Sequence, residues 1–174
     1  MYYSGFYPMH LALLTVASNL MPMAWWTPIS KEPFRFLVAM DRKNHTSSLL
    51  REHREAVLNF LPWTQRERVV RAGYLTGRKV RKAERLGFHL TPAKQLKHTG
   101  VVDGIYAAFE LVVVSELQEP AGDHVPFVCD VVHVHRRRRP ALGEPILFLG
   151  YRDFATLGER WRFSLPTRTS LFNP

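Results

Sequence analysis

Residues 18–30 read "SNLMPMAWWTPIS" and continue directly into "KEPFRFLVAM" at positions 31–40. The first stretch is apolar almost throughout and contains two adjacent tryptophans, and the second has apolar residues at every other position from its "FRFLVAM" part onward. Such alternation predicts a strand with one buried face. Because neighbours on a strand point to opposite faces, Trp25 and Trp26 cannot face the same side. If Trp25 faces the interior, Trp26 needs a cover, which is either another subunit or a flat aromatic ligand.

The remaining sequence predicts about six strands, with helices inserted after the third and the fourth. Hydroxyl residues before Leu49 are typical of a helix N-terminus, Thr64 and Glu67 have the spacing of a capping box at the start of a second helix, and Gly87 ends a third. Two long β-branched runs around "QEPAGD" predict a hairpin. Closing a small sheet removes its exposed edges, so we expect a barrel. The strand-like runs are 10–16, 21–29, 34–40, 56–61, 105–117 and 124–135, with 145–151 as a final candidate.

The composition, with 46% apolar and 22% charged residues over 174 positions, is that of one globular domain. No apolar run reaches the roughly 18 residues needed to cross a bilayer, and residues 1–18 lack the early positive charge of a secretory signal. We therefore expect a cytoplasmic protein without membrane association. Cys129 is the only cysteine and lies in an apolar stretch, which predicts a buried, inert thiol.

The net charge of +9 indicates a polyanionic partner, either nucleic acid or a phosphorylated small molecule. Charge alone does not choose between them. The densest basic cluster, Arg136 to Arg139, lies between a strand-like run and a Pro/Gly turn, and we interpret it as a solvated loop tip.

The segment "DRKNHTSS" at 41–48 collects cationic side chains, hydroxyls and free backbone N–H groups where a strand ends and a helix begins. This is the outline of a phosphate site, although an ordinary capped helix with solvated basic neighbours has the same composition. A second basic turn, "TGRKVRK" at 76–82, has Gly77 for tight backbone, and its cationic residues are Arg78, Lys79 and Lys82.

Metal binding and side-chain catalysis are both disfavoured. His133 and His135 share one face of a strand, but no carboxylate or third histidine shows ligand spacing nearby, so we expect no metal. The sequence has no nucleophile elbow, Walker loop or dinucleotide glycine fingerprint. If the protein is an enzyme, a cofactor carries out the difficult chemistry.

Four segments, in this order, resemble the flavin-reductase-like family of FMN-binding split barrels, which includes flavoredoxin-like flavoproteins. The resemblance covers roughly Pro8 to Val134 and is carried by "NLMPMAWWTPISKEPFRFLVAM", "DRKNHTSSLLREHREAVLNFLP", "LTGRKVRKAERLGF" and "AAFELVVVSELQEPAGDHVPFVCDVVHV". It implies a mainly β, six-stranded antiparallel split barrel with inserted helices, forming a single FMN-binding domain over 1–174. It also implies a homodimer with FMN near the subunit boundary, and a C-terminal segment, 146–174, that covers the flavin or the dimer interface.

By this resemblance the flavin ring lies along Asn19 to Thr27 and Ala39 to Asp41, and its phosphate lies against the start of the following helix. No catalytic acid is required, and His124 is a candidate contact for a nicotinamide. The implied cofactor-binding residues are Asn19, Met21, Ala24, Trp25, Trp26, Thr27, Ala39, Met40, Asp41, Arg42, His45, Thr46 and Ser47, with Arg78 and Lys79 from the second basic turn.

The implied activity is that of an NAD(P)H:flavin oxidoreductase, in which NADH or NADPH donates a hydride to the flavin and an oxygenase or another electron-transfer partner is the acceptor. One alternative is an FMN-binding electron carrier or flavin store without reductase turnover. Another, from a different class, is a basic β-barrel that binds nucleic acid through Arg136 to Arg139 and exposed aromatic side chains.

Overall fold

The computed structural model describes residues 5–117, 122–136, 141, 143–150 and 152–158. Within them a curled seven-stranded sheet has the order β3-β2-β6-β9-β10-β5-β4, and every neighbouring pair is antiparallel. A three-stranded sheet, β1-β11-β12, and a two-stranded sheet, β7-β8, complete the β structure. The strands are β1 (Met9–His10), β2 (Ala12–Val16), β3 (Asn19–Met23), β4 (Trp26–Lys31), β5 (Phe34–Asp41), β6 (Glu55–Phe60), β7 (Leu90–Pro92), β8 (Gly100–Val102), β9 (Ala107–Glu116), β10 (His124–Arg136), β11 (Leu147–Phe148) and β12 (Phe154–Ala155), and the helices are α1 (His45–His53), η1 (Trp63–Gln65), α2 (Arg66–Tyr74) and α3 (Lys82–Leu86).

The main sheet is a split barrel because its two edge strands are joined by one short bend. Trp26 N donates to Ala24 O at 3.0 Å, and this bend divides residues 21–29 into β3 and β4. Trp25 O accepts from Ala39 N at 2.9 Å, which ties the bend to β5. The mainly β split-barrel prediction is confirmed, but its count of six strands is wrong, because the predicted second strand is two strands at opposite edges.

The final predicted strand, at 145–151, is much shorter than expected. Among the described residues of this range, 145–150, β11 is the one strand, and it pairs with β1 and β12 outside the main sheet. The predicted hairpin is confirmed, since β9 and β10 pair over most of their lengths.

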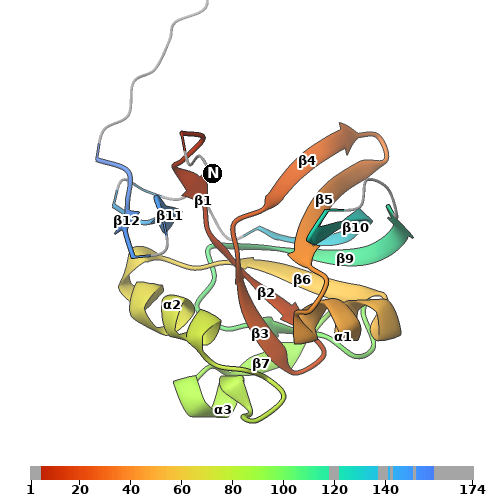
Figure 1. Ribbon diagram of the computed structural model, residues 1–174, viewed down its shortest axis with the longest axis horizontal. Helices are drawn as coiled ribbons and strands as arrows, with labels where there is room; N and C mark the ends of the chain where they lie inside the picture. The colour runs from red at the N-terminus through yellow and green to blue at the C-terminus, as the bar shows by residue number, and fades with distance from the viewer. Residues whose placement is uncertain (1–4, 118–121, 137–140, 142, 151, 159–174) are drawn as a thin grey trace, which may run out of the picture.

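Two apolar cores lie on the two faces of the sheet. Ala12, Leu14 and Val16 of β2 point into the barrel, and Leu11 and Leu13 point into a second core with α2. This double burial explains why β2 is apolar at every position except Thr15. Figure 1 shows the helices gathered at the end of the molecule near β2 and β3, whereas the β4–β5 hairpin projects at the opposite end.

The helix predictions are correct in place and partly wrong in their caps. The cap of α1 is Asn44, whose side chain accepts from Thr46 N at 3.1 Å, and the following hydroxyls are inside the helix. The capping box expected at Thr64 does not form, because η1 occupies that position and α2 has no side-chain cap. Gly87 ends α3 with φ +67°, as predicted.

Cys129 is buried, as predicted, and burial raises the pKa of its thiol to about 12. In the described part of the chain, no helix combines the length and the apolar character needed to span a membrane.

Candidate functional site

A cavity of about 690 Å³ lies beside the bend that joins β3 to β4. One wall is built from the bend and the end of β5, and the opposite wall from α2 and the small β1-β11-β12 sheet. In Figure 1 the small sheet lies above α2, so that both face the bend. The first wall consists of Met21, Pro22, Met23, Ala24, Trp25, Ala39, Met40, Asp41 and Asn44, the second of Tyr7, Leu11, Val70, Gly73, Tyr74, Phe148 and Phe154, and the rim of Asp123 and His124.

Trp25 is held in place at the rim of this cavity. Its ring packs against the His124 ring with 4.3 Å between centroids. His124 Nδ1 in turn lies 2.8 Å from an Asp123 carboxylate oxygen, and the backbone O of Asp123 accepts from Arg42 N at 3.0 Å. The rim therefore fixes the Trp25 indole beside a mainly apolar space.

The start of α1 lies next to the cavity, which its N-cap Asn44 lines, and contains buried polar atoms. Thr46 Oγ1 accepts from Asn19 Nδ2 at 2.8 Å, which leaves the Thr46 hydroxyl hydrogen available for donation. Asn19 Oδ1 and Ser47 Oγ are both buried without a hydrogen-bond partner. Because buried polar atoms are nearly always paired, these two unpaired oxygens, one on β3 and one in the first turn of α1, make this place a candidate for ligand contacts.

The second basic turn packs directly on Asn19 and the start of α1. A Cβ added to Gly77 would lie 2.2 Å from Asn19 Oδ1 and 3.1 Å from His45 Cδ2, so only glycine allows this approach. The turn is closed by Lys79 N donating to Thr76 O at 3.1 Å. It carries the exposed Arg78 and Lys79 to the neighbourhood of α1, as the sequence predicts.

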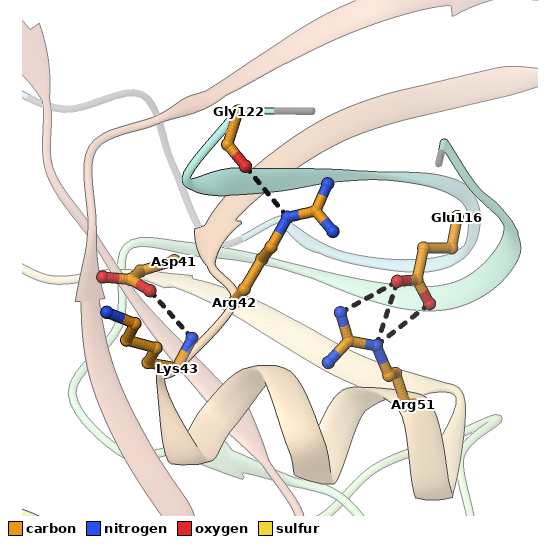
Figure 2. Close-up of polar contacts among 6 residues, drawn as sticks. All are labelled: Asp41, Arg42, Lys43, Arg51, Glu116 and Gly122. Carbon is orange, nitrogen blue, oxygen red and sulfur yellow. Dashed lines mark hydrogen bonds and ion pairs between the residues drawn. The ribbon is translucent and has the colours of Figure 1, made fainter. Parts of the chain in front are cut away.

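The basic residues before and within α1 have different hydrogen-bond partners. Arg42 Nε donates to Gly122 O at 2.9 Å, and Figure 2 shows this side chain directed toward β10 rather than along α1. Lys43 N donates to Asp41 Oδ1 at 2.8 Å. Arg51, farther along α1, pairs with Glu116 (Figure 2). Arg42 is therefore anchored above the start of α1 by the chain's own backbone.

The structure brings most of the predicted site residues together but separates two of them. The predicted residues that line the cavity are Met21, Ala24, Trp25, Ala39, Met40, Asp41 and His124. Those that lie together at the start of α1 are Asn19, His45, Thr46 and Ser47. Trp26 packs on Phe36 and Phe60 and donates its Nε1–H to His10 O at 2.8 Å, so it lies outside the cavity. Thr27 is exposed on β4.

Lys82 has a structural position. Its Nζ donates to Leu20 O and Ala72 O, each at 2.8 Å, and thereby holds α3 against β3 and α2. Burial lowers the pKa of Lys82 to about 8.

Sequence reasoning missed Tyr7 and Tyr74 of the second wall, whereas Phe148 and Phe154 belong to the C-terminal segment that was expected to cover the flavin or the dimer interface. Tyr7, Tyr74, Phe148 and Phe154 come from three distant segments with no shared local pattern. Asn44, in contrast, could have been found, because asparagine before a predicted helix is a common N-cap.

A second groove, of about 650 Å³, lies on the β4–β5 hairpin. Its apolar members include Trp26, Ile29, Phe34, Phe36 and Phe109. Ile29 is 48% exposed and Phe34 36% exposed, which is unusual for large apolar side chains that lie side by side.

The sequence shows no carboxylate at ligand spacing from His133 and His135, but the fold brings one close to them. Glu110 on the neighbouring strand places a carboxylate oxygen 2.6 Å from His135 Nε2. Cross-strand pairing, which local spacing does not reveal, brings these residues together.

Comparison with known proteins agrees with this fold. Residues 4–158 match the flavin reductase like domain. An uncharacterised protein of Archaeoglobus fulgidus is 31% identical over 143 residues, which cover 82% of this chain and 79% of that protein. An FMN-binding protein from Thermus thermophilus with bound 1-cyclohex-2-enone is 26% identical, has a TM-score of 0.81 and aligns over 92% of this chain and 93% of its own. Flavoredoxin from Methanosarcina acetivorans shares the fold, with 20% identity, a TM-score of 0.82 and 98% of both chains covered. The chain therefore belongs to the flavin reductase like domain family.

Proposed function

We propose that the protein is an FMN-binding oxidoreductase that uses NADH or NADPH as electron donor. The observation that carries this proposal is a mainly apolar cavity lined by Asn44, the N-cap of α1, next to the place where Asn19 Oδ1 and Ser47 Oγ are buried without a hydrogen-bond partner. FMN has the matching shape, an apolar ring system with an anionic tail. The Thermus thermophilus relative, which is named as FMN-binding, supports the same ligand. When bound, FMN would supply the hydride and electron chemistry that the side chains lack.

The phosphate would be held mainly by hydroxyl groups. The backbone N–H groups of Thr46 and Ser47 already donate to Asn44, so they are only partly available. The hydroxyl hydrogens of Thr46 and Ser47 remain, and both side chains are buried beside the helix start. Arg78 and Lys79 would add positive charge from the adjacent turn, and Arg42 would add positive charge from the end of β5.

The ring would lie along the bend from Met21 to Trp25 and along Ala39 to Asp41. These two segments form one surface because Ala39 N donates to Trp25 O. The role of the protein would be to orient the ring, to neutralise the phosphate and to leave one ring face accessible. His124 lies at the rim with its ring packed on Trp25, and there it would contact the nicotinamide.

We further propose a homodimer in which a second copy covers the groove on the β4–β5 hairpin. The exposure of Ile29 and Phe34 supports this, since such a patch is typical of an interface. Phe148 and Phe154 line the cavity, which supports the proposal that the C-terminal segment covers the flavin. Residues 159–174 lie outside the described residues.

A reductase assay tests the proposal. Purified protein should be yellow or should take up one FMN per chain, and it should oxidise NADH or NADPH in the presence of FMN. Flavin binding without turnover would instead indicate an electron carrier or flavin store. A colourless protein that takes up no FMN and binds oligonucleotides with a steep salt dependence would favour the nucleic-acid alternative, for which Arg136 to Arg139 are the candidates; their side chains lie outside the described residues.

The second wall of the cavity favours a second candidate function, direct reduction of a small uncharged acceptor. Tyr7 and Phe148 meet edge to face at 4.9 Å and form an aromatic surface opposite the proposed ring. The described residues that line the cavity include Asp41 and Asp123 but neither lysine nor arginine, so an anionic acceptor would be repelled. The cyclohexenone bound by the Thermus thermophilus protein is an uncharged compound of this kind.

A matched pair of acceptors tests this second function. Cyclohex-2-enone should support NAD(P)H oxidation with a lower KM than its 3-carboxylate derivative. If neither compound is consumed, the acceptor is instead a partner such as an oxygenase.

A further inference from the structure

A cluster of one carboxylate and two imidazoles lies outside the cavity and has no part in the proposed flavin site. Glu110 is on β9, and His133 and His135 are on the neighbouring β10. One potential ligand atom from each residue lies within 4.8 Å of the other two.

A β-bulge on β10 brings the histidines onto the face of Glu110. Val131 pairs with Leu111, but the next pair along the strands joins His133 to Glu110, so Val132 is the additional residue. Without this bulge Val132 would stand opposite Glu110 and both histidines would point to the other face. Bulges commonly redirect side chains in this way beside functional sites.

Glu110 is completely buried and ionised. Its Oε1 accepts from Lys94 N at 2.7 Å and from His135 Nε2 at 2.6 Å, and its Oε2 accepts from Gln95 N at 2.7 Å. Desolvation by itself would raise the pKa of Glu110, but these hydrogen bonds and the nearby His135 outweigh it, and the pKa is lowered. In the described residues no lysine or arginine side chain pairs with this buried anion, and Oε2 retains one free lone pair.

His133 has the freedom that a metal ligand would need. Within the described residues its ring contacts the His135 ring, at 4.6 Å between centroids and 74° between planes, and no hydrogen bond holds its nitrogens. It is half-buried, so it can be reached from solvent.

We propose that Glu110, His133 and His135 bind a divalent transition-metal ion, with Zn²⁺ as the best match. Two imidazoles and one carboxylate are a common three-ligand set for zinc, and a fourth position would remain for water. At bond lengths of about 2.0–2.2 Å, tetrahedral ligand atoms lie roughly 3.4 Å apart, so the His133 ring would move inward by about an ångström. The ion would replace the hydrogen bond between His135 and Glu110 and would link β9, β10 and the segment that contains Lys94 and Gln95. Mg²⁺ and Ca²⁺ prefer oxygen ligands and should not bind.

Metal titration of untagged, full-length protein tests this site. After treatment with a chelator, the protein should take up one Zn²⁺ per chain in competition with a chromophoric chelator, and Zn²⁺ but not Mg²⁺ should raise its Tm. His133→Ala should weaken Zn²⁺ binding by at least about tenfold and abolish the rise in Tm. His89→Ala, at an exposed histidine outside the cluster, is the matched control and should bind as the wild type does.

Glu110→Gln is a second variant that retains the shape of the side chain, with circular dichroism as a check of its fold. It should also lose Zn²⁺ affinity. Absence of Zn²⁺ uptake by the wild type, or equal affinity in the wild type and His133→Ala, would overturn the proposal. Because every readout is metal binding or Tm, the result does not depend on the flavin chemistry.

Discussion

Ser47→Ala separates ligand binding from stability more sharply than any other change at the start of α1. Ser47 is fully buried, and its Oγ has no hydrogen-bond partner in the protein. Removing an unpaired buried hydroxyl costs the folded protein little, so the free energy of unfolding without ligand should change by less than about 0.5 kcal/mol. If the hydroxyl donates to the FMN phosphate, the same change removes a hydrogen bond to a charged group.

Such a bond contributes about 1.5–3 kcal/mol, which corresponds to a loss of roughly 10- to 150-fold in FMN affinity. Riboflavin lacks the phosphate, so its affinity should stay within about twofold of the wild-type value. Isothermal titration calorimetry measures the affinities for FMN and riboflavin, and urea unfolding of the flavin-free protein measures the free energy of unfolding.

Thr46→Ala is the informative comparison. Thr46 Oγ1 accepts from the buried Asn19 side chain, so this variant should lose stability of about 1–3 kcal/mol as well as FMN affinity. The reasoning is refuted if Ser47→Ala weakens FMN and riboflavin equally, or if it leaves the affinity for FMN unchanged.

Three further predictions follow from groups around the site and in the core. Gly77→Ala should destabilise the protein by about 1–3 kcal/mol and weaken FMN retention, because the new Cβ would lie 2.2 Å from Asn19 Oδ1; a variant with wild-type Tm and flavin content would contradict the close packing of this turn. The pKa of Lys82 is about 8 in the folded protein, below its ordinary value of 10.5, so at this residue the unfolded state binds more protons between these pH values, and the contribution of Lys82 to the free energy of unfolding should rise with pH across that window. Lys82→Met should remove that rise in urea unfolding measured from pH 7 to 10.5, and a parallel pH profile in both proteins would refute the assignment. Cys129 should resist Ellman's reagent at pH 8 until the protein is unfolded, because burial raises its pKa to about 12; rapid labelling of the native protein would show that the thiol is accessible.

The parts of the fold that could be predicted from sequence are those with a local physical signal. The alternation along β5, the long β-branched runs of β9 and β10, and Gly87 at the end of α3 each identify an element by themselves. The bend at Ala24 could not be predicted in this way, because its residues are as apolar as the strands on either side. The bend results from tertiary contacts. Trp25 O accepts a hydrogen bond from Ala39 N of β5, whereas the Trp26 ring packs on Phe36 and Phe60.

The residues of the site likewise divide into those with a local sequence signal and those that only tertiary packing brings together. The hydroxyls of α1 and the basic turn at Gly77 carry compositional signals, and the structure brings them together through Asn19. The aromatic wall that includes Tyr7 and Phe148 has no such signal, since it depends on how distant segments pack. The cluster around Glu110 was missed because one bulge decides which face the histidines take.

The central claim is that FMN occupies the cavity beside Trp25 with its phosphate at the start of α1. A crystal structure of the protein with FMN measures this directly. The account predicts phosphate density within hydrogen-bond distance of the Thr46 and Ser47 hydroxyls and ring density along Met21 to Trp25 and Ala39 to Asp41. Flavin density in the β4–β5 groove, or a cavity filled by the protein's own side chains at saturating FMN, would contradict it.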